Sequence, residues 1–307
     1  MNFSMMKKNM VKLFRERGAV DALTHIIWWF VTIVFVHILK NYLRISNTTK
    51  QISAMVRIKN EAQFLYASIE SIIDCVEEVV LIDNLSSDGT PLIIQDLCRK
   101  YPNKVRAYEY RHEIVRAGED HEKLAKTNPA SERLTANYYN WCLKKLSKPY
   151  VLKWDGDMIA MNKFCQSVKE FKTINKQTMR FDGINILPDY RYYIIGHVSN
   201  LETRIFRKTF AKYLSESVTQ VLSHPFLAAS FTVEEKCYVH LKLCKSDPTS
   251  NHSAIFAKEW LDAINNYATL PVTQDVMEIF SRYKLGIKQS SSMHIGISNS
   301  DQSIYTT

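Results

Sequence analysis

The sequence predicts an α/β fold in which a mostly parallel, Rossmann-like central sheet is flanked by helices. Short apolar runs bounded by polar turn residues alternate with segments whose apolar residues recur at helical spacing. Over residues 51–110 this alternation gives strand, helix, strand, helix, strand, which is the order expected for a doubly wound parallel sheet. The chain has 307 residues, 46% of them hydrophobic, and can therefore bury a sheet on both faces.

Local sequence features predict each strand and helix in the first half of the domain. QISAMVRI (51–58) and EEVVLIDN (77–84) are short and apolar, so each is predicted as a strand. Residues 60–76 place apolar side chains at helical spacing, and Pro91 stands at a favoured early position of the next helix. The elements that follow are a helix at 91–101, a strand at 103–110, a polar irregular loop at 111–130, a helix at 131–146 with Ser131 as a possible N-cap, and a strand at 150–154.

The second half is predicted to be richer in strands. Apolar and β-branched residues favour strands within 177–187, 190–197 and 201–208, and a further strand that holds His240. Two helices, at 253–267 and 273–285, are predicted to close the body. We therefore expect one domain over 49–285, followed by a polar, serine-rich tail at 286–307 that is predicted to be disordered.

Residues 1–48 form a basic leader with an apolar segment. No formally charged residue occurs in the 18 positions of 22–39. A membrane-spanning helix needs roughly 20 apolar residues, with a range of about 17 to 25. We therefore predict membrane association through a single N-terminal helix at 22–39, which either spans the bilayer or lies in its interface. A helix buried in the globular body is the alternative.

Composition excludes some classes of protein. The net charge is +9, but lysine and arginine are interleaved with acids and form no long basic run, so we expect no nucleic-acid partner. A modest positive excess suits an anionic substrate or an anionic membrane surface. The six cysteines show no CxxC spacing, which argues against zinc ribbons and redox pairs and favours a reduced compartment.

Carboxylates stand where predicted strands end. YVLKWDGDMIA (150–160) places Asp155 and Asp157 one residue apart after an apolar run, with Gly156 between them. In an open α/β sheet, ligands gather at the carboxyl ends of the strands. Two hard oxygen donors this close can hold Mg²⁺ or Mn²⁺ while a diphosphate supplies further oxygens. An ordinary turn rich in aspartate is the alternative.

Two further strand ends belong to the same predicted edge. The strand at 77–84 ends in Asp83, and the first strand ends in Arg57, Asn60 and Glu61. These groups offer directional donors and acceptors for a nucleotide base and cationic donors for a diphosphate. The joint pattern indicates a nucleotide site more strongly than any one of the motifs.

Three stretches together resemble a known family. RIKNEAQFL, VVLIDNLSSDGT and YVLKWDGDM are similar, in order and spacing, to the nucleotide-binding half of the family 2 glycosyltransferases, which have the GT-A fold. ETRIFRK (202–208) resembles a block of the subgroup related to lipopolysaccharide-core and capsule glycosyltransferases. The resemblance implies a GT-A fold with a more divergent acceptor half.

The resemblance also implies roles for individual residues. Asp83 would accept from the imide of the base, Asp155 and Asp157 would hold a metal and the donor diphosphate, and the strand-borne histidine would complete that shell. The implied donor-binding residues are Arg57, Asn60, Glu61, Asp83, Asp88, Arg133 and Asp155, and the implied ligands of Mn²⁺ or Mg²⁺ are Asp155, Asp157 and His240. Arg133 enters because only Asn140 matches the family's Arg-Asn pair.

The general base departs from the family pattern. Where the subgroup has Val-His-Glu, this chain has SVTQVL, with Thr219 and Gln220 at the polar positions. An inverting transfer needs a carboxylate to take the proton of the acceptor hydroxyl. The candidates are Glu216, Glu234 and Glu235.

The predicted function is an inverting, metal-dependent transfer of a sugar from a nucleotide sugar, with UDP as the expected nucleotide. The acceptor would be a glycan or a lipid-linked molecule. A nucleotidyltransferase on a related sheet is one alternative, but RIKNEA lacks the glycine-rich loop that such enzymes need after strand one. A non-catalytic, membrane-tethered module is the other, and in it the Asp-Gly-Asp stretch would be only a turn.

Overall fold

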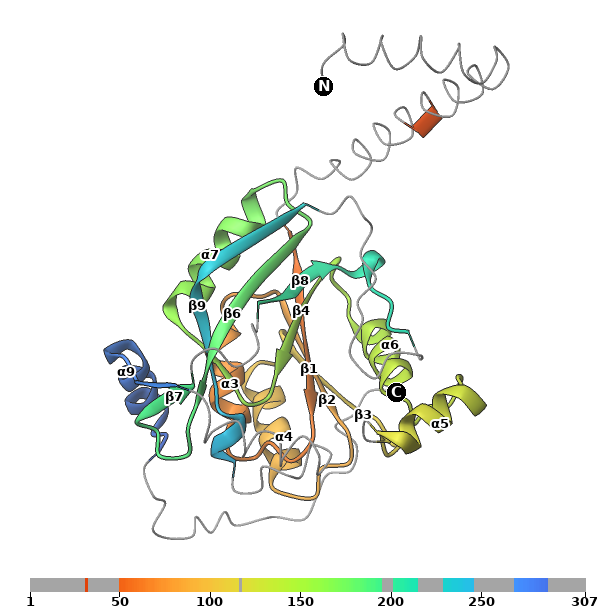
Figure 1. Cartoon of the computed structure of the whole chain (residues 1–307), viewed down its shortest axis with the longest axis horizontal. Coiled ribbons are helices and arrows are strands. Elements are labelled where there is room, and N and C mark those ends of the chain that lie inside the picture. Colours follow the sequence, from red (N-terminus) through yellow and green to blue (C-terminus); the bar gives the residue numbers. More distant parts are fainter. Residues whose placement is uncertain are drawn as a thin grey trace. The chain divides into compact units, whose positions relative to one another are not determined.

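The computed structural model describes residues 31–32, 50–115, 118–194, 201–214, 229–245 and 268–286 (Figure 1). The chain divides into two units, 1–49 and 50–307. The sheet lies in the second unit.

Four parallel strands form the first half of the sheet in the order β3-β2-β1-β4 (Figure 1). They are β1 (Ile52–Ile58), β2 (Glu78–Asp83), β3 (Val105–Glu109) and β4 (Tyr150–Asp155). The helices that join them are α3 (Leu65–Ile72), α4 (Thr90–Lys100), α5 (Glu119–Thr127) and α6 (Thr135–Lys145). Because the strands are parallel, their carboxyl ends meet at one edge.

The second half of the sheet is mixed. Its strands are β5 (Met158–Ala160), β6 (Thr178–Ile186), β7 (Tyr192–Ile194), β8 (Glu202–Arg207), β9 (Ser230–His240) and β10 (Thr269–Pro271). β8 runs antiparallel to β4, and β9 pairs with both β6 and β5. In the β5–β9 register Met158 lies opposite His240, which brings the end of β9 to the turn that follows β4.

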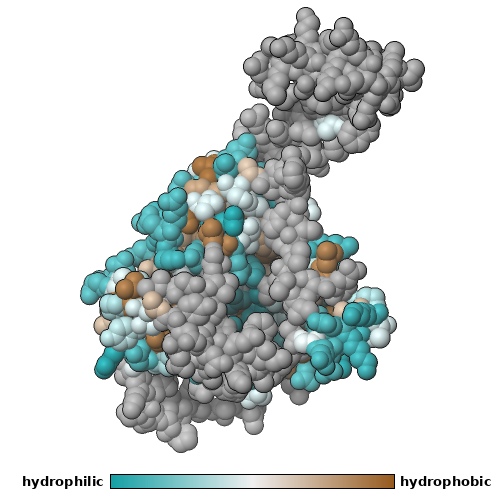
Figure 2. Space-filling view, in the orientation of Figure 1, coloured by the Kyte–Doolittle hydropathy of each residue, from teal (hydrophilic) through white to brown (hydrophobic). Residues whose placement is uncertain are grey.

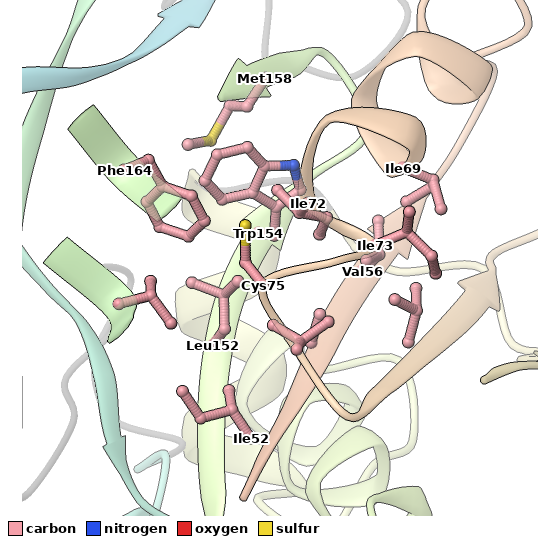
Figure 3. Packing of buried hydrophobic residues seen from close by; sticks show 14 of the residues in the cluster. Ile52, Val56, Ile69, Ile72, Ile73, Cys75, Leu152, Trp154, Met158 and Phe164 are labelled. Carbon is pink, nitrogen blue, oxygen red and sulfur yellow. The ribbon is translucent and has the colours of Figure 1, made fainter. Parts of the chain in front are cut away.

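Helices cover both faces of the sheet. α3, α4 and α7 (Asn162–Thr173) pack on one face around a cluster that includes Trp154. Figure 3 shows the Trp154 ring between Phe164 and Ile72, with Met158 beside it. α6 covers the other face with a largely aromatic cluster, and α9 (Gln274–Tyr283) packs on β6 and β9. Trp154 is fully buried, so the strand that carries the two aspartates is anchored in the core.

The predicted α/β class with a mostly parallel central sheet is confirmed, and some local predictions are wrong. Helix α5 lies inside the segment predicted as an irregular loop. It is polar, with His121 as its one buried residue, and it shows a hydrophilic surface in Figure 2. α6 begins at Thr135 without a side-chain cap, so Ser131 is not its N-cap. α7 was not predicted, and the predicted helix at 253–267 lies outside the described residues.

The cysteines also correct an expectation. Cys75 and Cys165 form a disulfide, which joins the turn after α3 to helix α7. The expectation of a reduced compartment rested on sequence spacing. These residues are 90 positions apart in sequence, and only the packing of α7 against α3 brings their Cα atoms to 5.5 Å.

The prediction of membrane localisation is overturned. No helix among the described residues is both long and apolar enough to cross a bilayer. Of the apolar segment 22–39, only Val31 and Thr32 are described, as helix.

Candidate active site

The turn between β4 and β5 carries Asp155, Gly156 and Asp157, and hydrogen bonds hold it at both ends. The indole Nε1–H of Trp154 donates to Ser68 Oγ at 3.0 Å, and Ser68 Oγ–H donates to the Asp155 carbonyl at 3.1 Å. The Leu241 N–H, just past β9, donates to the Asp157 carbonyl at 2.9 Å. The turn is thus tied to α3 on one side and to β9 on the other.

Gly156 is required by a close approach. A Cβ atom at this position would lie 2.9 Å from Glu61 Cγ and 3.3 Å from Glu61 Cδ. Real Cβ atoms almost never come so close to a neighbouring atom. The absence of a side chain at Gly156 therefore lets the loop after β1 pack directly on the Asp-Gly-Asp turn.

Asp155 is held by two arginines. Arg57 Nη2 donates to its Oδ1 at 2.8 Å, and Arg204 Nη1 lies 3.4 Å from its Oδ2. Both guanidinium groups are buried, and Arg57 also lies 4.0 Å from the centre of the Tyr139 ring. Burial alone would raise the pKa of the Asp155 carboxyl, but the two guanidinium groups hold that pKa well below its usual range.

Asp157 is buried and has different neighbours. Its Oδ1 lies 3.3 Å from His240 Nε2, and its Oδ2 lies 2.7 Å from Lys245 Nζ. Burial opposes its ionisation, but Lys245 and His240 outweigh this and lower its pKa far below the usual value. Lys245 Nζ also lies 2.6 Å from Glu61 Oε1, while burial, followed by the charge of Asp157, raises the pKa of Glu61.

The pair formed by Asp157 and His240 fits a divalent ion. His240 Nδ1 lies 3.0 Å from Asn185 Oδ1, an amide oxygen that can only accept, so the proton is on Nδ1. Nε2 faces the Asp157 carboxylate, so it donates to Oδ1 when the ring is protonated and can give a lone pair to a bound ion when the ring is neutral. Neighbouring ligands of an octahedral ion with bonds of about 2.1 Å lie about 3.0 Å apart, close to the observed 3.3 Å.

Asp157 and His240 alone do not complete the coordination of a divalent ion. Among the described residues, no group of three or more His, Cys, Asp and Glu side chains is arranged to hold a metal. Asp155, a predicted ligand, directs its oxygens to Arg57 and Arg204 and does not join the pair. An ion here would therefore depend on oxygens supplied by substrate or water.

Asp83, the predicted base-binding residue, is buried at the end of β2. The Ser86 N–H donates to its Oδ1 at 3.2 Å, and burial raises the pKa of its carboxyl. Its neighbour Asn84 donates through Nδ2 to the carbonyls of Tyr110 and His112 at 3.0 and 2.8 Å, which ties the β2 loop to the chain after β3.

Two predicted donor-binding residues tie loops together. Asp88 accepts from the backbone N–H groups of Ala62 and Thr90, at 3.1 and 3.0 Å. Asn60 adopts a left-handed conformation with φ of 55° and accepts from the Ser87 N–H at 2.8 Å. In this structure both residues join the loop after β1 to the loop after β2.

Arg133 lies apart from the two aspartates. It is exposed, its Nε donates to the Glu113 carbonyl at 3.3 Å, and it lines a cavity of about 340 Å³ beside α5, together with Asp120 and Lys123. Asn140 is likewise structural, because it exchanges two hydrogen bonds with the backbone of Tyr213.

The predicted bases do not gather at the site. Glu234 and Glu235 are exposed on β9, and Glu235 pairs with Lys163 at 2.6 Å. A strand rises about 3.3 Å per residue, so Glu235 lies roughly 16 Å from His240. Both glutamates therefore lie along β9, several residues before the end of the strand that reaches the site. Glu216 lies outside the described residues.

Sequence reasoning missed three residues that the structure brings to the site. Arg204 reaches Asp155 from β8, Lys245 reaches Asp157 from the chain after β9, and Asn185 orients His240 from β6. Alternation gave no signal for Arg204, because the β6–β8 register shifts beside it and Arg204, Ile205 and Phe206 are all buried. Lys245 and Asn185 carry no spacing signal.

Comparison with known protein families matches one segment of the chain. Residues 41–171 match the family described as beta-1,4-N-acetylgalactosaminyltransferase (CgtA). The match covers β1 through α7 and includes the Asp-Gly-Asp turn. No curated protein matches the chain.

Solved structures give more distant likenesses. TarS 1–349 of S. aureus aligns with a TM-score of 0.41 and 15% identity over 62% of this chain and 60% of that chain. Glucosyl-3-phosphoglycerate synthase from Mycobacterium tuberculosis, in complex with Mn²⁺, UDP and phosphoglyceric acid, aligns with a TM-score of 0.30 and 17% identity, over 48% of this chain and 47% of that chain. This chain therefore spans less than two thirds of either structure.

The segment that matches a glycosyltransferase family is the segment that builds the parallel strands and the turn with the two aspartates. The parallel strands and the place of that turn at their carboxyl edge agree with the fold that the GT-A resemblance implied. Over residues 41–171 the protein is therefore similar to a glycosyltransferase family.

Proposed function

We propose that the protein is an inverting, metal-dependent glycosyltransferase of family 2 that uses a UDP-sugar donor. The observation that carries this proposal is the placement of Asp157 Oδ1 and His240 Nε2, 3.3 Å apart at the carboxyl edge of the sheet. A hard carboxylate oxygen and a neutral imidazole suit Mn²⁺, and Mg²⁺ is the second candidate. When bound, the ion would supply positive charge to the leaving diphosphate.

The protein's own residues would bind and orient the donor. Asp83 would accept from the imide of the base through Oδ2, because among the described residues its Oδ1 already accepts from Ser86. Arg57 and Arg204 would keep the Asp155 carboxylate ionised and place positive charge beside the turn. Such fixed charges stabilise charge that develops on a leaving group.

The matched family suggests the sugar and the stereochemistry. Its members are named for transfer of N-acetylgalactosamine in a beta-1,4 linkage. A β-linked product is what inversion of an α-linked sugar nucleotide gives. We therefore propose UDP-N-acetylhexosamines as the first donors to test, and a glycan or lipid-linked molecule as the acceptor. The acceptor base stays a prediction, with Glu216 as its remaining candidate.

A screen of sugar nucleotides with the purified full chain tests the proposal. We expect release of UDP from a UDP-sugar that depends on Mn²⁺ or Mg²⁺ and stops when EDTA is added. A nucleotidyltransferase would instead release pyrophosphate from a nucleoside triphosphate. If no sugar nucleotide is turned over while Mn²⁺-dependent UDP binding is also absent from calorimetry, the proposal is wrong.

A further inference from the structure

A buried lysine lies between two buried carboxylates next to the proposed metal pair. Lys245 Nζ is 2.6 Å from Glu61 Oε1 and 2.7 Å from Asp157 Oδ2. The exposed fractions of the three side chains are 9% for Lys245, 7% for Glu61 and 5% for Asp157. An ammonium held this closely in the protein interior neutralises charges that water cannot reach.

Three separate segments meet to build this contact. Glu61 lies in the loop after β1, Asp157 in the turn before β5, and Lys245 directly after the short helix η2 (Lys242–Cys244). Gly156 allows the Glu61 side chain to approach the turn, as described above. The arrangement is therefore a product of the tertiary structure and not of one flexible surface side chain.

The contact divides the Asp157 carboxylate between two partners. Oδ2 is bonded to Lys245, and Oδ1 faces His240 Nε2. Two carboxylates that face each other across a gap form a natural position for a cation, and paired metal ions in enzymes lie about 3.5–4 Å apart. Here the second cation position is already filled by the protein's own ammonium.

We propose that Lys245 is a positioning residue that limits the site to one divalent ion, held by Asp157 Oδ1 and His240 Nε2. This inference rests on the proposed function, because it assigns a role to Lys245 within the proposed metal site. The ammonium fixes the orientation of Asp157 and occupies the place between Glu61 and Asp157 that a second ion would take.

Counting bound Mn²⁺ tests this role without measuring activity. The paramagnetic resonance signal of free Mn²⁺ is followed while the full chain is titrated at neutral pH. We expect one ion per chain in the wild type and two in Lys245→Met, which has a similar volume and no charge. Lys245→Arg restores a cation and should return the count to one. In Glu61→Gln/Lys245→Met the second position loses a ligand, so the count should again be one.

A matched control separates this role from a general loss of buried charge. Lys153 is also buried, pairs with Glu202 at 2.9 Å, and lies in the Asp155 cluster. Lys153→Met should leave the number of bound ions unchanged. If the number of bound ions rises as much in Lys153→Met as in Lys245→Met, the proposal is overturned.

Each outcome is informative. If the wild type and Lys245→Met both bind one ion, the inference about Lys245 is wrong while the proposed metal-dependent function stands. If the wild type binds none and Lys245→Met binds one, Lys245 fills a cation position but the metal-dependent function fails. If neither binds an ion, both are overturned. Should Lys245→Met fail to fold, Mn²⁺ must restore its circular dichroism spectrum, and a variant that stays unfolded in Mn²⁺ refutes the proposal.

Discussion

Asp155 and Asp157 are one residue apart in the same turn, yet they lie in two different charge clusters. Asp155 is paired with two arginines, whose charge does not change in the physiological pH range. Asp157 faces Nε2 of a histidine and a lysine shared with Glu61. The first cluster keeps its cations fixed, whereas we propose that the second can exchange one cation for another.

The difference arises from the topology of the sheet. Asp155 still belongs to β4, where Arg57 lies opposite it on β1 and Arg204 reaches it from β8. Asp157 follows the turn and meets the end of β9, which the β5–β9 register brings alongside. The partners of Asp155 therefore lie on neighbouring strands, whereas His240 and Lys245, the partners of Asp157, lie at the end of β9 and just after it. Four substitutions test this division.

The largest expected effect comes from Asp157→Asn. It removes the carboxylate of the proposed metal pair while Glu61 and Lys245 remain paired. We expect kcat to fall by about 10³-fold and Mn²⁺ binding to be lost, since charge stabilisation by a bound ion contributes several kcal/mol. Asp155→Asn serves as the comparison, and it should retain Mn²⁺ affinity. Equal loss of Mn²⁺ binding in both variants would contradict the division.

Arg204→Met should mainly affect stability. It leaves Asp155 with Arg57 alone, and breaking part of a buried ion pair costs about 2–3 kcal/mol after allowance for the partial exposure of Asp155. Urea denaturation measures this loss. A change in unfolding free energy below about 0.5 kcal/mol, the usual range for surface changes, would show that Arg204 does not hold the turn.

The pH dependence of this loss has a defined sign. The lowered pKa of folded Asp155 contributes stability that is complete above its unfolded value of about 3.9. That stability disappears as the pH falls below this value toward the folded pKa. The gap between wild type and Arg204→Met should therefore be constant near neutral pH and narrow below about pH 4.

Gly156→Ala should act on the Asp157 cluster selectively. The added Cβ would meet Glu61 Cγ at 2.9 Å, and Glu61 cannot move without straining its bond to Lys245. We expect a loss of about 1–3 kcal/mol in stability together with altered Mn²⁺ binding. Thermal unfolding and Mn²⁺ titration measure the two effects. Unchanged Mn²⁺ binding would mean that Glu61 moves aside freely.

The smallest effect is expected from Trp154→Phe, which should loosen the Asp155 side of the turn. The substitution removes the indole N–H that holds Ser68, and Ser68 in turn holds the Asp155 carbonyl. A buried hydrogen bond of this kind contributes about 1 kcal/mol, and a further loss follows from the smaller ring. Urea denaturation gives the total. A Mn²⁺ affinity that changes much more than stability would show that the turn is anchored elsewhere.

Local patterns in the sequence predict the parallel half of the protein and the positions of its acids. Short apolar runs, helical spacing and turn residues are local signals, so β1, β2 and β4 and the aspartates that end β2 and β4 could be read from them. The similarity of three strand ends to a glycosyltransferase family could also be read, because those motifs are contiguous.

The partners of these acids follow from long-range packing and not from local patterns. Arg204, Asn185 and Lys245 reach the turn through strand pairing and chain crossings whose register no local pattern encodes. The Cys75–Cys165 bond depends in the same way on the packing of α7 against α3. Long-range contacts follow from the joint packing of many segments, so they separate Asp155 from Asp157 although the sequence sets the two side by side.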